Sequence, residues 1–297
     1  MHWTSRVAVL LAGLVLTAGC TASAGPTADP SPSLSTSAAP AFRSYVALGD
    51  SYTAGPLVPT TDVAQGCFRS SGNYPSLLAK RLTVQRFTDV SCSAATTRAL
   101  THPQHTFGDA NLPPQLRALR ADTDLVTLGI GGNDLDLFAS LVQRCVRLRA
   151  SDPTGAPCTR VESPAAWSRT TARIGRRVAT SLREIHRRAP KATVVLVGYL
   201  RLTPDHGTCP GLPLAAGDYA LGRSVSRSLD DALRAAARRT GSTFLDSYAL
   251  SAGHDVCSAH PWVNGATPDQ QRAAPYHPFA VGMRAEAAAL ATLLSPR

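Results

Sequence analysis

The sequence predicts an α/β fold built on a parallel, doubly wound sheet, and two observations lead to this class. Short apolar runs rich in β-branched residues, without alternation, indicate strands buried on both faces. Longer segments with apolar residues every three or four positions lie between them and indicate amphipathic helices. Strands that alternate with helices form a parallel sheet covered by helices. The chain has 297 residues, 44% of them hydrophobic, which suffices for one large domain with a substantial core.

The strand candidates each end at or beside a turn residue. Four of them are well defined: residues 45–48 before Gly49, 125–128 before Gly129, 193–197 before Gly198, and 243–245 before Asp246. A weaker candidate covers residues 87–90. The sequence therefore predicts a sheet of about five parallel strands.

Two long helices are predicted from the spacing of apolar residues. In the first, Ser163-Pro164 is a suitable cap and first turn, and apolar residues recur at Ile174, Val178, Leu182 and Ile185. The second carries Val225, Leu229, Leu233 and Ala236 and ends at Gly241. A last, Ala-rich helix is expected over residues 280–294, with shorter helices over 75–82 and 114–119.

The N-terminus has the pattern of an export signal. Arg6 is followed by a continuously apolar run over residues 7–16 and then by small residues before Cys20. This resembles the bacterial lipobox, in which the signal peptide is cut before a cysteine that receives a diacylglyceryl group. Residues 1–19 are thus predicted to be a lipoprotein signal peptide and Cys20 to be lipidated. The lipobox usually has Leu where this chain has Thr17, so ordinary cleavage near residues 22–24 is the alternative.

A tether is predicted between the signal and the folded domain. Residues 20–41 are almost entirely Thr, Ser, Ala, Pro and Gly after the cysteine, a composition typical of flexible linkers. Residues 42–297 are expected to form the folded domain. We therefore expect an exported protein attached to the outer face of the cell membrane, with a freely secreted protein as the alternative.

The cysteines fit an exported protein. Setting Cys20 aside, the chain has six, and an even number in an exported chain indicates three disulfides. Six cysteines allow 15 connectivities. Their order along the chain favours the pairs Cys67–Cys92, Cys145–Cys158 and Cys209–Cys257. No CxxC or HxxxH spacing occurs in the sequence, and no metal site is predicted.

The composition also excludes some functions. The sequence has no apolar run of about 18 residues, which excludes a polytopic membrane protein. The 30 basic and 20 acidic residues give a formal net charge of +10, which could suggest an anionic partner. However, no basic cluster is interleaved with aromatic residues, so nucleic-acid binding is not expected.

Polar residues follow several of the predicted strands. Ser51 follows the first, in Gly-Asp-Ser-Tyr; Asn133 follows the third, in Gly-Gly-Asn-Asp; and His277 precedes the last helix, in Pro-Tyr-His-Pro. Ser93 lies in Ser-Cys-Ser-Ala after the weak second strand. The carboxyl ends of parallel strands share one edge of a sheet. These residues are therefore expected to meet there.

Together these residues fit acyl transfer. A serine hydroxyl such as that of Ser51 needs a base to take its proton, and a histidine such as His277 is the usual base at neutral pH. The side-chain amide of Asn133 and the main-chain N–H groups of Ser51 and Ser93 can form an oxyanion hole. Each residue alone has a simpler explanation, as a helix cap, a turn residue or a loop histidine. Their joint occurrence after strands favours ester hydrolysis.

These motifs closely resemble those of the SGNH (GDSL-type) hydrolases, in particular the secreted actinobacterial esterases and lipases. Gly-Asp-Ser-Tyr at 49–52 resembles the nucleophile block, Gly-Gly-Asn-Asp at 131–134 the asparagine block, and His277-Pro278 the histidine block. The resemblance covers residues 43–294. It implies a flavodoxin-like three-layer α/β/α sandwich with about five parallel strands, no lid domain, no metal, no cofactor, and hydrolysis of carboxylic esters.

The sequence departs from the family pattern at two positions. The family's second block presents a glycine N–H to the oxyanion hole; alignment on Cys92 assigns this role to Ser93, with Ala94 as the alternative. The usual acid lies three residues before the histidine, where this chain has Ala274. We therefore expect the main-chain carbonyl of Ala274 to orient His277, with Asp255 as the alternative partner.

The predicted function is an exported serine esterase or lipase that acts as a monomer on ester or lipid substrates. Ser51 is the expected nucleophile, His277 the general base, and Asp50 shapes the turn that presents Ser51. The alternatives are a phospholipase, a polysaccharide deacetylase, or a non-catalytic surface-binding lipoprotein, since a fold does not determine a function.

Overall fold

Five parallel strands form the central sheet of the computed structural model, which describes residues 42–295. The expected signal peptide, Cys20 and the tether lie outside the described residues. The strands are β1 (Ser44–Gly49), β4 (Arg86–Asp89), β7 (Leu125–Gly129), β8 (Thr193–Val197) and β9 (Thr243–Leu245). They lie in the order β4-β1-β7-β8-β9. The predicted flavodoxin-like sheet is confirmed.

The strand order predicts a ligand-binding crevice outside the carboxyl end of β1. The chain leaves β1 towards β4 on one side and later returns to β7 on the other side. β1 and β7 are in register from Tyr45 opposite Leu125 to Gly49 opposite Gly129. In such sheets ligands bind outside the carboxyl ends of the strands where the winding direction reverses. This edge is where Ser51 and Asn133 emerge.

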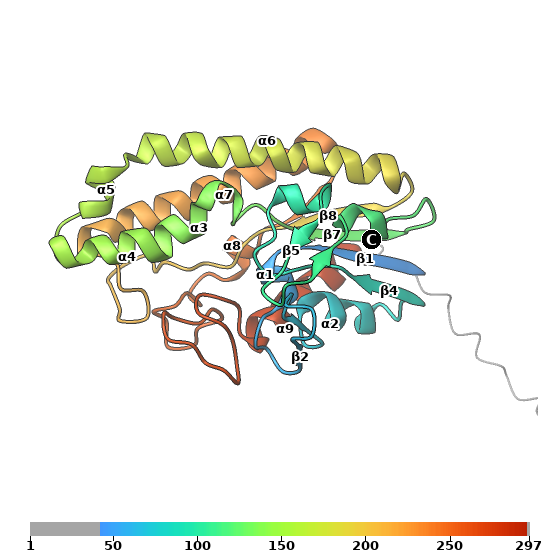
Figure 1. Ribbon diagram of the computed structural model, residues 1–297, viewed down its shortest axis with the longest axis horizontal. Coiled ribbons are helices and arrows are strands. Elements are labelled where there is room, and N and C mark those ends of the chain that lie inside the picture. Colours follow the sequence, from blue (N-terminus) through green and yellow to red (C-terminus); the bar gives the residue numbers. More distant parts are fainter. Residues whose placement is uncertain (1–41, 296–297) are drawn as a thin grey trace, which may run out of the picture. The chain divides into compact units, whose positions relative to one another are not determined.

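Helices cover both faces of the sheet, which gives the three layers seen in Figure 1. The long helices α6 (Pro164–Arg188) and α7 (Tyr219–Thr240) pack on one face, over Val46 and Leu48 of β1. The helices α2 (Tyr74–Arg81) and α9 (Ala280–Leu294) pack on the other, against Tyr45 and Ala47. Because side chains alternate along a strand, one apolar run supplies both cores.

The long helices begin and end at the signals in the sequence. The Ser163 side chain accepts a hydrogen bond from the main-chain N–H of Ala166, and Pro164 is the first residue of α6. Gly241 ends α7 in the left-handed conformation, with φ of 70°. Within residues 42–295, no helix combines the length and apolar character needed to cross a lipid bilayer.

One short helix is shorter than predicted. Residues 114–119 form a single 3-10 turn, η2 (Gln115–Ala118). Its Gln115 side chain accepts from the N–H of Gly49 at 2.8 Å and donates to the Gly49 carbonyl at 2.9 Å. The turn therefore braces the end of β1.

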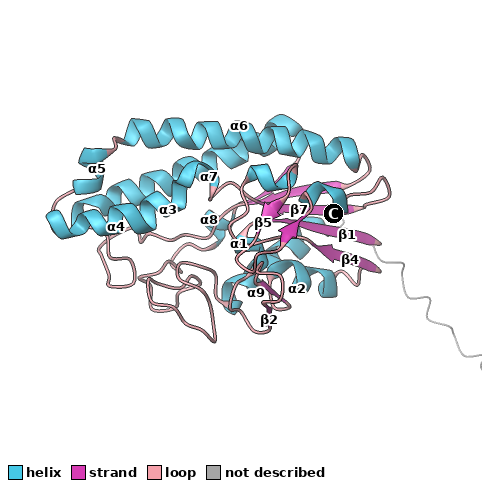
Figure 2. Cartoon of the chain, viewed as in Figure 1, coloured by secondary structure: helices cyan, strands magenta, loops and turns pink. Residues whose placement is uncertain are grey.

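Several short elements, which were not predicted, lie in the connections between the main strands and helices. They are two ribbons, β2 (Thr61–Asp62) with β3 (Arg69–Ser70) and β5 (Gln104–His105) with β6 (Asn111–Leu112), and the helices α1 (Ser51–Ala54), η1 (Thr97–Leu100), η6 (Ala216–Asp218) and α8 (Ser247–Leu250). A helical excursion between β7 and α6 comprises η3 (Asp134–Asp136), α3 (Leu137–Ala139), η4 (Ser140–Arg144), α4 (Cys145–Leu148), η5 (Arg149–Ser151) and α5 (Pro157–Val161). Figure 2 shows the connection from α8 to α9 as a long loop.

Three disulfides join these connections. The bonded pairs are Cys67–Cys92, Cys145–Cys158 and Cys209–Cys257, which are the pairs favoured by their order in the chain. Cys67–Cys92 links the connection after β1 to the connection after β4. Cys145–Cys158 closes the excursion before α6. The bridges thus brace the loops at the edge where the polar residues gather.

Candidate active site

Ser51 is presented by a sharp turn at the end of β1. A Cβ atom at Gly49, where φ is +154°, would come within 2.3 Å of Thr53 Oγ1, so a side chain does not fit there. Asp50 then caps α1, because its Oδ1 accepts a hydrogen bond from the Tyr52 N–H at 2.9 Å. The turn leaves Ser51 as the first residue of the helix, facing a cavity at the sheet edge. Asp50 does shape this turn, as expected.

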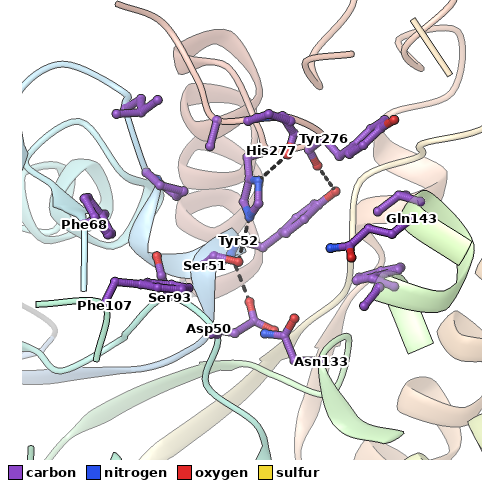
Figure 3. A pocket seen from close by; sticks show the side chains of 18 of the residues that line it. Asp50, Ser51, Tyr52, Phe68, Ser93, Phe107, Asn133, Gln143, Tyr276 and His277 are labelled. Atoms are coloured by element: carbon purple, nitrogen blue, oxygen red, sulfur yellow. Dashed lines mark hydrogen bonds between the residues drawn. The ribbon is translucent and has the colours of Figure 1, made fainter. Parts of the chain in front are cut away.

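His277 lies against Ser51, as Figure 3 shows. Its Nε2 is 2.7 Å from Ser51 Oγ, and its Nδ1 is 2.7 Å from the main-chain carbonyl oxygen of Pro275. A carbonyl only accepts, so Nδ1 carries the proton and Nε2 is free to accept the serine proton. Burial lowers the pKa of His277, an effect partly opposed by the Pro275 carbonyl. The imidazole is therefore neutral at pH 7 and suited to act as a base.

The expected orienting group was wrong by one residue. The carbonyl of Ala274 accepts the main-chain N–H of His277 at 3.1 Å and so closes a turn instead of meeting the ring. An acid at position 274 would reach the ring through its side chain, whereas a main-chain acceptor has to lie nearer in the chain. Asp255 is buried, but its Oδ1 accepts the Cys257 N–H at 2.8 Å. The structure shows no contact between Asp255 and His277.

The loop that carries His277 is fastened to the serine turn. Tyr276 has φ of +62°, which rotates its carbonyl towards the Tyr52 hydroxyl, and the two oxygens are 2.6 Å apart. The Tyr52 ring packs beside the imidazole with centroids 5.4 Å apart. The main-chain N–H of Asn264 donates a hydrogen bond to the His277 carbonyl at 2.9 Å. Tyr52 was not singled out in the sequence, although it adjoins the serine.

Two of the expected oxyanion donors face the cavity from different strands. Asn133 follows β7, and one N–H of its side-chain amide donates to the Ala95 carbonyl at 2.9 Å. That bond fixes the amide and leaves its second N–H for a ligand. The main-chain N–H of Ser51 has no acceptor among residues 42–295. Both residues line the cavity beside His277.

The third expected donor was misplaced. The N–H of Ser93 already donates to the Cys67 carbonyl at 3.1 Å, and the Ser93 hydroxyl donates to the same oxygen at 2.8 Å. Ala94, the alternative, has φ of +62°, the conformation that glycine adopts most easily. Its N–H has no acceptor in the described part of the chain, and it lines the cavity. Ala94 therefore occupies the position suited to a main-chain donor.

Asp134 joins the loops that bear these donors. It is fully buried and accepts from the main-chain N–H of Thr97 at 2.8 Å and from its hydroxyl at 2.5 Å. Arg177 of α6 forms an ion pair with Asp134, with 3.0 Å between a guanidinium nitrogen and Asp134 Oδ1. The loop with Asn133 is thus tied both to the loop with Ala94 and to a long helix. The sequence motif contained Asp134, but nothing in its spacing revealed these partners.

The cavity at this edge has a volume of about 650 Å³. Leu57, Phe68 and Phe107 are among the apolar residues that line it. Phe138, Val142 and Leu202 also line it, together with the polar Gln143. Figure 3 shows Phe68 and Phe107 on one side of Ser51 and Gln143 on the other. The side chains of Ser51 and His277 therefore open into a space with a mainly apolar lining.

The site has no evident place for a metal ion. Among residues 42–295, no three His, Cys, Asp or Glu side chains are grouped so that they could hold one. The polar groups near Ser51 are the imidazole, an amide and main-chain donors. This set can activate a hydroxyl, hold an oxyanion and return a proton.

Comparisons with known proteins agree with this arrangement. The model of the GDSL-like lipase/acylhydrolase family matches residues 47–285. The chain is 39% identical to Lipase 2 of Streptomyces coelicolor over 247 residues, which cover 81% of this chain and 82% of that protein. It is 34% identical to a lipase of Streptomyces rimosus over 243 residues, with coverage of 80% and 81%.

Solved structures show the same fold. Phospholipase A1 from Streptomyces albidoflavus has 28% identity and a TM-score of 0.69, over 85% of this chain and 99% of that one. The extracellular lipase from Streptomyces rimosus has 29% identity and a TM-score of 0.68, over 84% and 98%. The similarity thus extends over nearly the whole length of both solved structures.

Proposed function

The chain belongs to the GDSL-like lipase/acylhydrolase family and is a serine hydrolase of carboxylic esters; on this basis we propose that Ser51 is its nucleophile and His277 its general base. The observation that carries the proposal is the 2.7 Å contact between Ser51 Oγ and His277 Nε2. With the Nδ1 proton held by the Pro275 carbonyl, Nε2 presents a lone pair to the serine hydroxyl.

Acylation follows from this geometry. Ser51 Oγ attacks the ester carbonyl carbon while its proton moves to His277 Nε2, which becomes an imidazolium. The carbonyl oxygen becomes an oxyanion and meets the N–H groups of Ser51 and Ala94 and the amide of Asn133. The tetrahedral intermediate collapses, the alcohol oxygen takes the proton from Nε2, and the acyl group remains on Ser51.

Deacylation repeats the same steps with water. His277 removes a proton from a water molecule as that water attacks the acyl carbon. The second tetrahedral intermediate uses the same three donors, and its collapse returns the proton to Ser51 Oγ and releases the carboxylic acid. Pro275 supplies a neutral oxygen to the imidazolium, so this dyad fixes the ring but stabilises its charge less than a carboxylate does.

The walls of the cavity support a fatty acyl ester as the substrate. Three phenylalanines line it, at positions 68, 107 and 138, and no Lys or Arg side chain from the described residues does so. Burying apolar chain is worth about 0.8 kcal/mol per methylene group. A neutral ester of an alkanoic acid therefore fits this cavity better than a short or charged acyl group.

A phospholipid ester is the second candidate. It is supported by the similarity to the phospholipase A1 structure and by the formal net charge of +10, which favours approach to an anionic surface. In that case the phosphate would lie outside the cavity, because the lining residues include no cation. Release of fatty acid from phosphatidylglycerol and triacylglycerol emulsions distinguishes the two substrates.

Hydrolysis of p-nitrophenyl esters of graded chain length tests the catalytic roles. Ser51→Ala and His277→Ala should each lose nearly all activity at every chain length. Ser242→Ala is the matched control, because Ser242 Oγ also contacts a histidine, His186, at 2.9 Å, away from the cavity. This control should behave as the wild type. Substantial turnover by Ser51→Ala would contradict the proposal.

The same substrates test the acyl site. Phe107→Ala should raise KM for decanoate esters more than for acetate, since the lost ring contacts only a long chain. Val161→Ala is the control, because Val161 is another exposed apolar residue, 61% exposed, that does not line the cavity. An equal effect of Phe107→Ala on both esters would argue against an acyl chain at this wall.

The proposal extends to location. We propose that the enzyme is exported and anchored through a lipid on Cys20, which lies outside the described residues. The three disulfides support export. Cys20→Ala should release the enzyme from the membrane fraction into the medium. Unchanged fractionation of this variant would remove the lipid anchor from the proposal.

A further inference from the structure

The hydroxyl of Tyr199 lies between the two loops that carry the proposed catalytic groups. Tyr199 follows β8, the strand beside β7, and is 7% exposed. Its oxygen accepts the main-chain N–H of Gly132 at 2.7 Å and donates to Asp50 Oδ2 at 2.5 Å. Gly132 precedes Asn133, and Asp50 precedes Ser51. One hydroxyl therefore contacts the neighbours of both residues.

Asp50, the acceptor of the Tyr199 hydroxyl, is buried and held in place by further hydrogen bonds. Asp50 is 1% exposed, and its other oxygen accepts the Tyr52 N–H. Its own main-chain N–H donates to the Gly129 carbonyl at 2.9 Å. Hydrogen bonds to an ionised group are shorter and roughly twice as strong as neutral ones. The Tyr199 bond thus fixes a turn that already has little freedom.

The Gly132 end has equally little freedom. A Cβ atom at Gly132 would lie 2.3 Å from Phe138 Cε2 and 3.1 Å from Tyr199 Cζ, so the two rings enclose its backbone. The Tyr199 ring also packs edge-on against Phe138, with centroids 5.0 Å apart, and against Tyr52 at 5.0 Å. The ring is therefore held by packing, and the hydroxyl is the part that links the loops.

We propose that Tyr199 is a positioning residue for ester hydrolysis: its hydroxyl sets the Ser51 turn and the Asn133 loop at the separation at which their donors meet one oxyanion. The chain of bonds runs from the Gly132 N–H through the Tyr199 O–H to the Asp50 carboxylate. Such chains polarise one another in a low-dielectric interior. This inference rests on the roles proposed for Ser51 and Asn133.

The charged groups around Asp50 define how the contact responds to pH. Burial raises the pKa of Asp50 to about 7, the bonds from Tyr199 and Tyr52 lower it, and the charge of Asp134 raises it. Asp134 is itself paired with Arg177. In the view of Figure 3, His277 lies on the opposite side of Ser51 from Asp50. The Tyr199 hydroxyl is therefore the side chain that favours the carboxylate form directly.

Tyr199→Phe tests the proposal because it removes the hydroxyl and keeps the ring. We expect kcat to fall by about ten- to a hundredfold, since a small misplacement of catalytic groups costs up to about that much. KM should change little, because the oxyanion contacts form mainly in the transition state. The part of the low-pH decline of kcat that protonation of Asp50 causes should also disappear, because in this variant the carboxylate has no Tyr199 hydroxyl to hold; the part that protonation of His277 causes should remain.

The matched control is Tyr45→Phe. Tyr45 is fully buried, and its hydroxyl pairs with Thr127 Oγ1 at 2.7 Å inside the sheet rather than at its edge. This variant also removes a buried hydroxyl, so it should lose similar stability yet keep the kcat and pH profile of the wild type. The amount of p-nitrophenol released by a p-nitrophenyl phosphonate counts the correctly folded active sites in each sample.

A double substitution separates positioning from general damage. Asp50→Asn keeps an acceptor for Tyr52 but removes the carboxylate that Tyr199 contacts. If both residues act through one contact, adding Tyr199→Phe to Asp50→Asn should cost far less than the product of the two single effects. Near-normal kcat in Tyr199→Phe, a loss confined to KM, a pH profile identical to that of the wild type, or independent effects of the two substitutions would each overturn the proposal. An active Ser51→Ala variant would instead overturn the catalytic assignment.

Discussion

The main-chain carbonyl of Pro275 holds the imidazole of His277, with 2.7 Å between the Pro275 oxygen and Nδ1. This contact takes the place of the carboxylate in a serine triad, because it selects the tautomer whose Nε2 faces Ser51. A neutral oxygen adds no charge opposite the imidazolium. In the proposed mechanism, main-chain geometry therefore orients the base.

Asp255→Asn should keep most of the wild-type kcat. Asp255 is the acid that sequence position suggested as a third member, but its Oδ1 accepts the Cys257 N–H, and asparagine retains that oxygen. Steady-state kinetics on p-nitrophenyl butyrate provides the measurement, with His277→Ala as the inactive comparison. A loss of about 10⁴-fold, as follows neutralisation of a triad acid, would restore Asp255 to that role.

Asn133→Ala should lower kcat by about a hundredfold or more, as the loss of one oxyanion donor does elsewhere. KM should change far less, because the contact strengthens as charge develops on the substrate oxygen. The variant also frees the Ala95 carbonyl, so thermal melting has to be measured beside the kinetics. A lower melting temperature with an unchanged kcat would leave Asn133 a purely structural residue.

The effect of a substitution at Ala94 on kcat should depend on whether the new residue tolerates the positive φ, and not on the chemistry of its side chain. Ala94→Gly keeps the N–H and suits a φ of +62°, so its kcat on acetate esters should match or exceed that of the wild type. Ala94→Val places a β-branched residue in a conformation that such residues strongly disfavour, so the N–H should shift and kcat should fall. Ser93→Ala, which leaves the Ser93 N–H on Cys67, is the control and should be active. The reverse order of effects would return the donor role to Ser93.

Removal of the Cys145–Cys158 bridge should affect both stability and chain-length preference. The two residues are 13 positions apart, and a loop of this size predicts a loss of about 3 kcal/mol in the free energy of unfolding. The bridge closes the excursion that carries Phe138 and Val142 into the cavity. Cys145→Ala with Cys158→Ala should therefore raise KM for decanoate more than for acetate. A proportional change for both esters would show that the bridge does not shape the acyl wall.

Glu286→Gln should stabilise the protein above pH 5. Glu286 is buried in α9 and accepts the Ser247 hydroxyl at 2.7 Å. Burial raises its pKa from 4.5 to about 8, although the Ser247 bond opposes this rise. Because the pKa of Glu286 is higher in the folded state than in the unfolded state, its contribution to the free energy of unfolding is fully present below pH 4.5. It is lost as the pH rises towards 8, by up to about 1.4 kcal/mol per unit.

Urea unfolding at several pH values measures this effect. Glutamine resembles the protonated acid and still accepts from Ser247, so the advantage of Glu286→Gln should grow from pH 5 to pH 8. Glu184→Gln is the control, because the bond from Arg188 lowers the pKa of the Glu184 carboxyl. The pKa shift of Glu184 has the opposite sign to that of Glu286, so Glu184→Gln should lose a little stability above pH 5. An advantage of Glu286→Gln that does not vary with pH would refute the argument.

The sequence predicted the sheet, and it singled out the residues proposed here as catalytic, because both depend on local patterns. The run that forms β8 contains three valines and one leucine, and its limits at Thr193 and Val197 are those of the strand. Ser51 and Asn133 each follow a strand, and parallel strands bring their carboxyl ends to one edge. Topology alone therefore brought these residues together.

The remaining features depend on individual dihedral angles, which the sequence does not reveal. Whether Pro275 or Ala274 meets the imidazole depends on the left-handed conformation of Tyr276, and the choice between Ser93 and Ala94 depends on that of Ala94. The ribbons β2/β3 and β5/β6 have two residues per strand, too few for a periodic pattern. Tyr199 was visible only as a residue after a strand until its two partners were known.

The proposed use of main-chain groups at this site has a consequence for genetics. The carbonyl of Pro275 and the N–H of Ala94 belong to the polypeptide itself, so most codon changes at these two positions leave the groups in place. Alanine scanning would report Pro275 as tolerant although the proposed mechanism needs its carbonyl, and such a scan does not test position 94, which is already alanine. Inactivating alleles should instead introduce proline at 94, or β-branched residues where Ala94 and Tyr276 have positive φ. Natural variation there records which backbone shapes are permitted rather than which side chains are used.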